Sequence, residues 1–271
     1  MKFAAPRPIL ALAFALAAAG AQAGPTLPDF DAAVFVPGAA ITNPYFPLLD
    51  DRTRIYTAAD AQGDPVDERF ELTRAGAGPI ILGVATTQRL DRSFEEGLLV
   101  EETFDFYAQD TAGNVWYLGE DVTNYVYDAG GHLIGTNHSS AWRAGVNGAL
   151  PGFAMPATQT LGQSYYQEFA AGDDALDQGE TSAIGLTVIA GGRTFSDVVR
   201  VYETSALEPD AREFKYYAPG VGLILAEEGL DANRMNPELT LALVAAVPEP
   251  SSALLLLLGL PMLAAWRRKA G

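Results

Sequence analysis

The chain has no cysteine and only two histidines among its 271 residues. Without thiols it cannot form disulfides, thiolate metal sites or a cysteine nucleophile. It also lacks the G-x-S-x-G motif of serine hydrolases and the glycine patterns of P-loop and dinucleotide-binding proteins. These absences leave few routes to covalent catalysis, and they favour a protein that is not an enzyme.

Basic residues are scarce as well, with 17 Lys and Arg against 34 Asp and Glu and a net charge of −17. All of the acids lie in the middle of the chain, because neither 1–23 nor 251–271 contains one. Phosphate backbones and anionic lipids repel such a body. We therefore expect no nucleic-acid partner.

The amino terminus has the pattern of a secretory signal peptide. Lys2 and Arg7 precede an apolar run, Ile9 to Ala19, and small residues follow at Ala21 and Ala23. The run is too short for a bilayer, which needs about 20 apolar residues. We predict that residues 1–23 are a signal peptide and that signal peptidase cuts after Ala23.

The carboxy terminus carries a Pro-Glu-Pro motif, a short apolar stretch and a basic cluster, in that order. The motif is Val247, Pro248, Glu249 and Pro250, the apolar stretch is 253–266, and the cluster is Arg267, Arg268 and Lys269. As a helix the stretch rises about 21 Å, which is short for a hydrocarbon layer of about 30 Å. We predict a short transmembrane helix whose basic end lies in the cytoplasm, which leaves the acidic body outside.

This tail, residues 247–271, resembles the PEP-CTERM sorting signal of Gram-negative bacteria. In that family an exosortase, a membrane protease, cuts the tail near the motif, usually in organisms that make extracellular polysaccharide. The resemblance implies an exported protein that is held in the inner membrane and then reaches the cell surface or the extracellular space. A permanent tail anchor is the alternative.

Between the two signals the chain reads as all-β. Residues 24–44 belong to a proline-rich segment without helical period, so we expect an extended, loosely packed leader. Residues 45–246 alternate short apolar or β-branched runs with turns and never keep a 3.6-residue period. We predict one antiparallel β domain, curved or barrel-like.

Two local patterns support that domain. Three segments share an Asp and, three positions later, a Gly, which is typical of hairpin turns: Asp60–Gly63, Asp110–Gly113 and Asp128–Gly131. Alternation from Leu98 to Gln109 predicts a strand with an apolar core face and a polar face toward solvent.

The body also resembles an uncharacterised family of secreted bacterial β-proteins, over most of Asn43 to Glu228. The matching stretches are Val100–Asp110, Gly113–Asp121, Gly148–Gly152 with Met155 and Pro156, and Lys215–Leu223. This resemblance implies a fold and no particular activity.

Candidate metal ligands are few. His132 and His138 could join Asp128, and an acidic stretch, Asp173, Asp174, Asp177 and Glu180, invites a calcium interpretation. A third imidazole and the spacing of a calcium loop are missing. Solvated side chains are the better interpretation, and we predict no metal and no cofactor.

Aromatic residues are the remaining candidates for binding a ligand. Trp116, Tyr117 and Trp142 could form a platform for a sugar ring or line a pocket, although strands also favour aromatics as core residues. We expect an exported surface or matrix protein that binds polysaccharide or a small apolar ligand, or that is purely structural. The alternative is a glycan hydrolase with two carboxylates about 5 to 9.5 Å apart, for which the sequence nominates no pair.

Overall fold

The computed structural model describes residues 24–248, with side chains up to residue 244. Within that range the chain forms fifteen strands and two short 3-10 helices, and it has no α-helix. The helices are η1 (Phe30–Ala32) and η2 (Ala171–Asp173). The strands are β1 (Arg52–Asp60), β2 (Pro65–Ile81), β3 (Val84–Glu95), β4 (Leu98–Gln109), β5 (Val115–Tyr127), β6 (Leu133–Asn137), β7 (Trp142–Arg143), β8 (Leu150–Met155), β9 (Ser164–Tyr166), β10 (Glu168–Phe169), β11 (Asp177–Ala190), β12 (Arg193–Ser205), β13 (Arg212–Ala218), β14 (Gly222–Glu228) and β15 (Leu239–Pro248). The all-β fold predicted from the sequence is confirmed.

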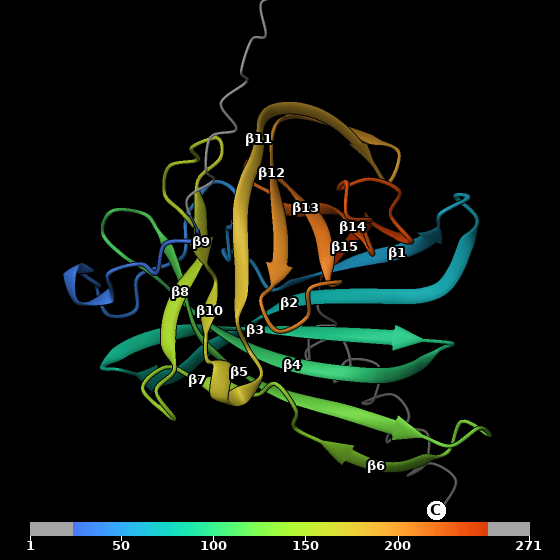
Figure 1. The fold of residues 1–271 in the computed structure, drawn as a ribbon, viewed down its shortest axis with the longest axis horizontal. Coiled ribbons are helices and arrows are strands. Elements are labelled where there is room, and N and C mark those ends of the chain that lie inside the picture. Colours follow the sequence, from blue (N-terminus) through green and yellow to red (C-terminus); the bar gives the residue numbers. More distant parts are fainter. Residues whose placement is uncertain (1–23, 249–271) are drawn as a thin grey trace, which may run out of the picture.

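All of these strands belong to one antiparallel sheet. Strands β1 to β5 form one meander and β11 to β15 form another (Figure 1). The two meanders join where β1 pairs with β15, from Arg52 opposite Pro248 to Asp60 opposite Leu239. This long-range pairing makes the sheet continuous and strongly curved.

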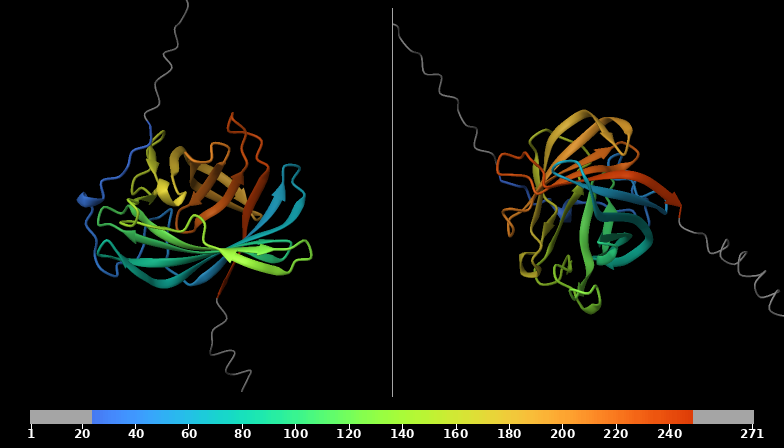
Figure 2. Two further views of the ribbon diagram at one scale, coloured as in Figure 1. Left: turned by 60° about the horizontal axis from the view of Figure 1, so that its bottom comes forward. Right: turned by 90° about the vertical axis from the view of Figure 1, so that its right-hand side faces the viewer.

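The two ends of the sheet meet at one segment, Ser164–Phe169. Its first part, β9, pairs with β11, and its second part, β10, pairs with β8. Gly152 in β8 permits this crossing, because a Cβ there would overlap the backbone carbonyl oxygens of Tyr166 and Gln167. The sheet is therefore nearly closed and barrel-like, as predicted (Figure 2).

The three predicted hairpin turns connect the expected neighbours. Asp60–Gly63 joins β1 to β2, Asp110–Gly113 joins β4 to β5, and Asp128–Gly131 joins β5 to β6. In each turn the glycine N–H donates to the aspartate carbonyl at 2.9 to 3.0 Å, and the aspartate carboxylate accepts further backbone N–H groups. The glycines have φ angles of +83°, +96° and +74°, which other residues rarely adopt.

Strand β4 has the predicted limits, but its polar face lies in a different environment. Thr103, Asp105 and Tyr107 were expected at the solvent face, and they are 5%, 3% and 4% exposed. These side chains line an internal cavity. The prediction was wrong because closure of the sheet encloses the polar face instead of leaving it in water.

Two apolar clusters support the sheet, one around Trp116 and the other around Tyr56 and Ile224. The leader packs on the first cluster: the rings of Phe30 and Phe35 lie 5.2 and 6.2 Å from the ring of Trp116. Further along, the leader is anchored by Ile41, fully buried, and by Asn43. The leader is thus held at a few points, and none of residues 24–40 is buried.

Asn43 shows how the anchor works. Its Nδ2 donates to the carbonyl oxygens of Gly113 and Pro156 at 3.0 and 3.2 Å, and its own N–H donates to Gln109 at 2.7 Å. A buried amide that satisfies its polar atoms in this way fixes the leader against β4 and β5.

Several predicted signals lie outside the described residues. These are the signal peptide with Ala21 and Ala23, the transmembrane helix, Glu249 and Pro250 of the motif, and the cluster Arg267, Arg268 and Lys269. Val247 and Pro248 form the last two positions of β15. Among the helices of residues 24–248, none has the length and hydrophobicity needed to cross a membrane.

Candidate functional site

A cavity of about 840 Å³ occupies the interior of the curved sheet. Its lining comes from β1 to β5 on one side and from β12 to β15 on the other, with β8, β10 and the start of β11 near the seam. Some lining residues, such as Glu95 and Glu208, are exposed, whereas Asp105 and Glu168 are buried. The cavity therefore opens to solvent at a rim and has a buried floor.

The lining is strongly acidic. It contains four basic side chains, Arg69, Arg89, Arg212 and Lys215. It contains thirteen acidic ones: Glu68, Asp91, Glu95, Glu101, Asp105, Glu120, Glu168, Asp174, Asp177, Glu203, Glu208, Glu213 and Glu228. A cavity lined mainly by negative charge concentrates cationic ligands and disfavours an apolar ligand.

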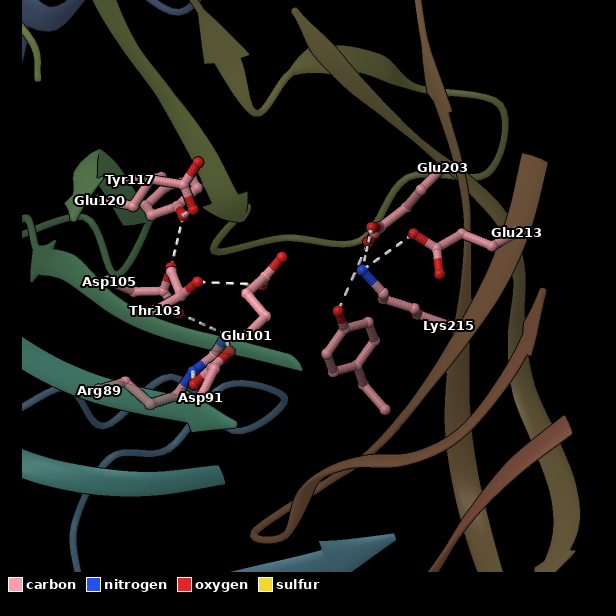
Figure 3. A network of polar contacts seen from close by, with 11 residues as sticks. Arg89, Asp91, Glu101, Thr103, Asp105, Tyr117, Glu120, Glu203, Glu213 and Lys215 are labelled. Atoms are coloured by element: carbon pink, nitrogen blue, oxygen red, sulfur yellow. Dashed lines mark hydrogen bonds and ion pairs between the residues drawn. The ribbon is translucent and has the colours of Figure 1, made fainter. Parts of the chain in front are cut away.

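Arg89 organises the wall formed by β3 and β4. Asp91 lies two residues further along β3 and so shares its face, and Asp105 of β4 lies opposite Arg89 in the register. Arg89 donates to Asp91 through Nε and Nη2 at 2.7 and 2.6 Å, and its Nη2 also donates to Asp105 at 2.9 Å (Figure 3). One guanidinium thus donates hydrogen bonds to two carboxylates.

Arg89 is held on aromatic rings as well. Its guanidinium carbon lies 5.3 Å from the ring centre of Phe46 and 5.0 Å from that of Tyr107. Phe46 lies between the leader and β1, so the packing of this connecting segment contributes to the position of the cation. Tyr107 in turn stacks on Tyr117 at 4.8 Å.

Tyr117 of β5 bridges two carboxyl groups. Its hydroxyl lies 2.5 Å from Asp105 and 2.8 Å from Glu120 (Figure 3). A phenol has one proton to donate, so the second carboxyl must carry a proton of its own and donate it to the phenol oxygen. We assign that proton to Glu120, because Arg89 already donates to Asp105. Burial, with Asp105 as a second cause, raises the pKa of Glu120 well above its usual range.

Lys215 organises the opposite wall. Its Nζ lies 2.8 Å from Glu203 of β12 and 3.0 Å from Glu213 of β13 (Figure 3). Gln167 donates to the other oxygen of Glu203 at 3.1 Å. Burial is the main cause that raises the pKa of Glu213 to about 7, against the lowering effect of Lys215.

Glu168 and Asp177 lie near the seam. Glu168 is 8% exposed, and burial, followed by Glu120, Asp177 and Asp105, raises its pKa well above the usual range. The pKa of Asp177 is also raised, again mainly by burial. The indole of Trp142 lowers the pKa of Glu168 in part, but its N–H has no acceptor within hydrogen-bond distance.

Among the three aromatic candidates, only Tyr117 lines the cavity. Trp116 is buried on the other face of β5, between the leader rings and Phe153 at 4.6 Å. Trp142 packs edge-on against Tyr117 at 5.5 Å. The structure thus places one candidate at the cavity and one directly against it, while Trp116 lies in an apolar cluster.

The candidate metal ligands are separated. His132 sits in an exposed turn with Asp128, and Nδ1 of His138 lies 2.6 Å from the carbonyl oxygen of Val122. In the acidic stretch, Asp173 accepts from Asn147, Asp177 lines the cavity and Glu180 pairs with Arg234. Across residues 24–248, no three acidic or histidine side chains converge closely enough for a metal ion.

The sequence reasoning missed the two charged clusters, around Arg89 and Lys215. A signal for them exists, since charged residues stand two apart at Arg89 and Asp91 and again at Glu213 and Lys215. Such alternation normally marks the solvent face of a sheet. Only closure of the barrel shows that these faces point inward.

Comparison with known proteins identifies the tail. The PEP-CTERM protein-sorting motif matches residues 246–269, which confirms the predicted resemblance. The motif is the sorting signal of exported proteins that an exosortase processes, so the chain is an exported protein with such a signal. Among curated proteins, none matches this chain.

Two crystal structures resemble the chain weakly. One is of a protein from Bacteroides fragilis, inferred to be exported, with a YmcC-like fold: it is 12% identical, the match covers 77% of this chain and 99% of that one, and the TM-score is 0.41. The other, from Parabacteroides distasonis and inferred to be a lipoprotein, is 11% identical over 75% of this chain and 98% of that one, with a TM-score of 0.35. Both TM-scores are below 0.5, so these two structures support no argument about this chain, and its fold is described from its own structure alone.

Proposed function

We propose that this protein is a cell-surface or matrix-associated binding protein whose β domain takes a hydrophilic ligand, such as part of an extracellular polysaccharide, into its cavity without chemical change. The observation that carries this proposal is the 840 Å³ cavity with its charged floor and tyrosine walls. Hydroxyl and amine groups can satisfy carboxylates, and sugar rings stack on tyrosine. An apolar ligand would leave those buried carboxylates unsatisfied.

The two terminal signals complete the proposal. Signal peptidase removes residues 1–23, and the tail 247–271 holds the protein in the inner membrane until an exosortase cuts near the Pro-Glu-Pro motif. The leader 24–44 and the domain 45–246 then form the mature protein at the cell surface. The match of residues 246–269 to the sorting motif supports this route.

A variant that fills the cavity tests the binding function. Ser93 lies on the wall, in β3, so Ser93→Trp places a large ring inside. Thr57→Trp makes a comparable change at an exposed position of β1 outside the lining. Oligosaccharides prepared from the extracellular polysaccharide of the host are titrated into each protein by calorimetry. We expect binding by the wild type and by Thr57→Trp and none by Ser93→Trp. Absence of binding by the wild type, or equal binding by all three proteins, would contradict the proposal.

Glycan hydrolysis is the second candidate function, and the Asp105–Tyr117–Glu120 arrangement favours it. A protonated Glu120 beside an Arg-bound Asp105 provides an acid and a carboxylate in different environments, as general acid–base catalysis requires. A reducing-sugar assay on the same polysaccharide tests it. An enzyme of this kind should release reducing ends and lose the activity in Glu120→Gln. A wild type without activity removes this candidate.

A further inference from the structure

The cavity floor holds more carboxyl groups than its cations can neutralise. Arg89 is shared by Asp91 and Asp105, and Lys215 is shared by Glu203 and Glu213. Nine other acidic residues line the cavity, and within the described chain no salt bridge joins them to a lysine or arginine. Glu120, Glu168 and Asp177 are the three of these that interact electrostatically with one another. Three carboxyl groups therefore share one region without a cation of their own.

Glu168 is the most isolated of the three. More than nine-tenths of the residue is buried, it lines the cavity, and within residues 24–248 the Trp142 N–H that faces it lies beyond hydrogen-bond distance. Its carboxyl oxygens are not among the fully buried atoms that lack a partner, so they are open to the cavity. Glu168 is thus placed to accept a hydrogen bond from a ligand in the cavity.

The surroundings of Glu168 determine what that donor must be. It interacts electrostatically with Glu120 of β5, Asp177 of β11 and Asp105 of β4, while Trp142 of β7 presents the opposing N–H. The charged groups among these are all acidic. A donor that also carries positive charge fits this environment, whereas an anion or a carbonyl acceptor does not.

We propose that the cavity binds a ligand with a primary ammonium group, which sits at Glu168 between Glu120 and Asp177. The proposal rests on the binding function proposed above and names the chemical class of its ligand. An ammonium is a cation with N–H donors, so it can donate to Glu168 while its charge offsets the nearby carboxyl groups that lack a cation. Tyr117 and Tyr107 provide ring surface beside this position, and aromatic rings attract organic cations.

A bare metal ion fits less well than an organic cation. Across the described part of the chain the acidic side chains do not converge into a set of three metal ligands. The cavity is also far larger than one ion needs. An amine with a carbon skeleton, aliphatic or sugar, fills more of it.

Binding of a cation should release protons. The raised pKa values of Glu168 and Glu120 mean that these groups keep their protons to higher pH than exposed glutamates do. The ammonium stabilises their ionised forms, so the protons leave as the ligand enters. Affinity for the ammonium should therefore rise with pH as these groups ionise.

Isothermal titration calorimetry of the full chain in non-ionic detergent tests the proposal. The probes are 1,5-diaminopentane and glucosamine, and the neutral counterparts are 1,5-pentanediol and glucose. We expect binding of at least one amine, no binding of its neutral counterpart, and heats that vary with the ionisation enthalpy of the buffer. The two amines distinguish an aliphatic source of the ammonium from an amino-sugar source.

Two variants locate the site. Glu168→Gln keeps the size of the side chain and removes its charge, so we expect the affinity for the amine to fall about 30-fold or more. Glu96→Gln removes one charge at an exposed turn outside the lining and should leave the affinity within about twofold. A thermal melt verifies that each variant folds, and Glu168→Gln should melt no lower than the wild type because it relieves an unpaired buried carboxyl.

The calorimetry distinguishes a failure of the ammonium proposal from a failure of the binding function. If glucose or polysaccharide fragments bind and both amines do not, the ammonium proposal is overturned and the binding function stands. If calcium chloride produces the only heat, the ligand is a metal ion and the proposal is again wrong. Equal loss of amine binding in both variants would show a general charge effect and overturn the assigned site. Absence of all binding overturns both proposals.

Discussion

Glu213 should make the folded protein less stable as the pH rises, and the structure gives the magnitude. Its pKa is raised from 4.5 to about 7, mainly by burial, with Glu203 and Glu228 adding to the effect and Lys215 opposing it. The folded state keeps this proton to higher pH than the unfolded state does. The stabilisation is therefore fully present below the unfolded pKa, near 4.5, and is lost as the pH passes through about 7. At about 1.4 kcal/mol per pKa unit the loss is at most about 3.5 kcal/mol. Because 26% of the side chain is exposed, solvent screening reduces this, and we expect about 1 to 3 kcal/mol.

The comparison with Glu213→Gln isolates this group from the other carboxyls. The variant cannot ionise, so its free energy of unfolding should lie close to that of the wild type at about pH 4.5 and exceed it by about 1 to 3 kcal/mol at about pH 8. Urea unfolding of both proteins, followed by tryptophan fluorescence at several pH values, measures the difference. Glu96→Gln makes the same chemical change at an exposed turn and controls for net charge. A difference that stays constant with pH, or that favours the wild type at high pH, would refute the reasoning.

Three further predictions concern the seam, the bridging phenol and the tail. Gly152→Ala should destabilise the protein by about 2 to 4 kcal/mol in urea unfolding, because the new Cβ forces β8 away from the crossing backbone, whereas Gly135→Ala, with open space around it, should have little effect. Tyr117→Phe leaves Asp105 and Glu120 without their shared hydroxyl and should cost about 1 to 3 kcal/mol by the same assay; an unchanged midpoint would show that the bridge is unimportant. Replacing Glu249 and Pro250 by alanine should leave full-length protein in the membrane fraction on an immunoblot, and normal release of the shortened protein would contradict the role of the motif.

Local features of the fold follow from local sequence. The hairpin turns were predictable because an Asp that accepts N–H bonds and a Gly at positive φ act within four residues. Strand β4 was predictable because apolar and polar residues alternate from Thr103 to Gln109, although Glu102 departs from the pattern. Each of these patterns depends on neighbours in the chain, so no knowledge of the rest of the protein is needed.

The candidate site was not predictable in the same way, because it depends on closure. Arg89 meets Asp105 across two adjacent strands, but Lys215 reaches the same cavity only because β1 pairs with β15 and the segment Ser164–Phe169 spans the seam. Those pairings link residues far apart in the sequence. The inward direction of the polar faces follows from them, which explains why a polar alternation was interpreted as a solvent face.

Closure also explains how the protein tolerates so acidic an interior. The cavity floor is built on rings and side chains of both apolar clusters, with Tyr107 and Tyr117 from the first and Tyr56 and Leu72 from the second. Burial of these clusters supplies the stability from which the unpaired carboxyls subtract. A protein selected for stability alone would replace Glu168 and Glu120 by neutral residues of similar size. Their presence at the floor of an open cavity, beside two cations that are already shared, is the physical reason to expect that a ligand completes the site.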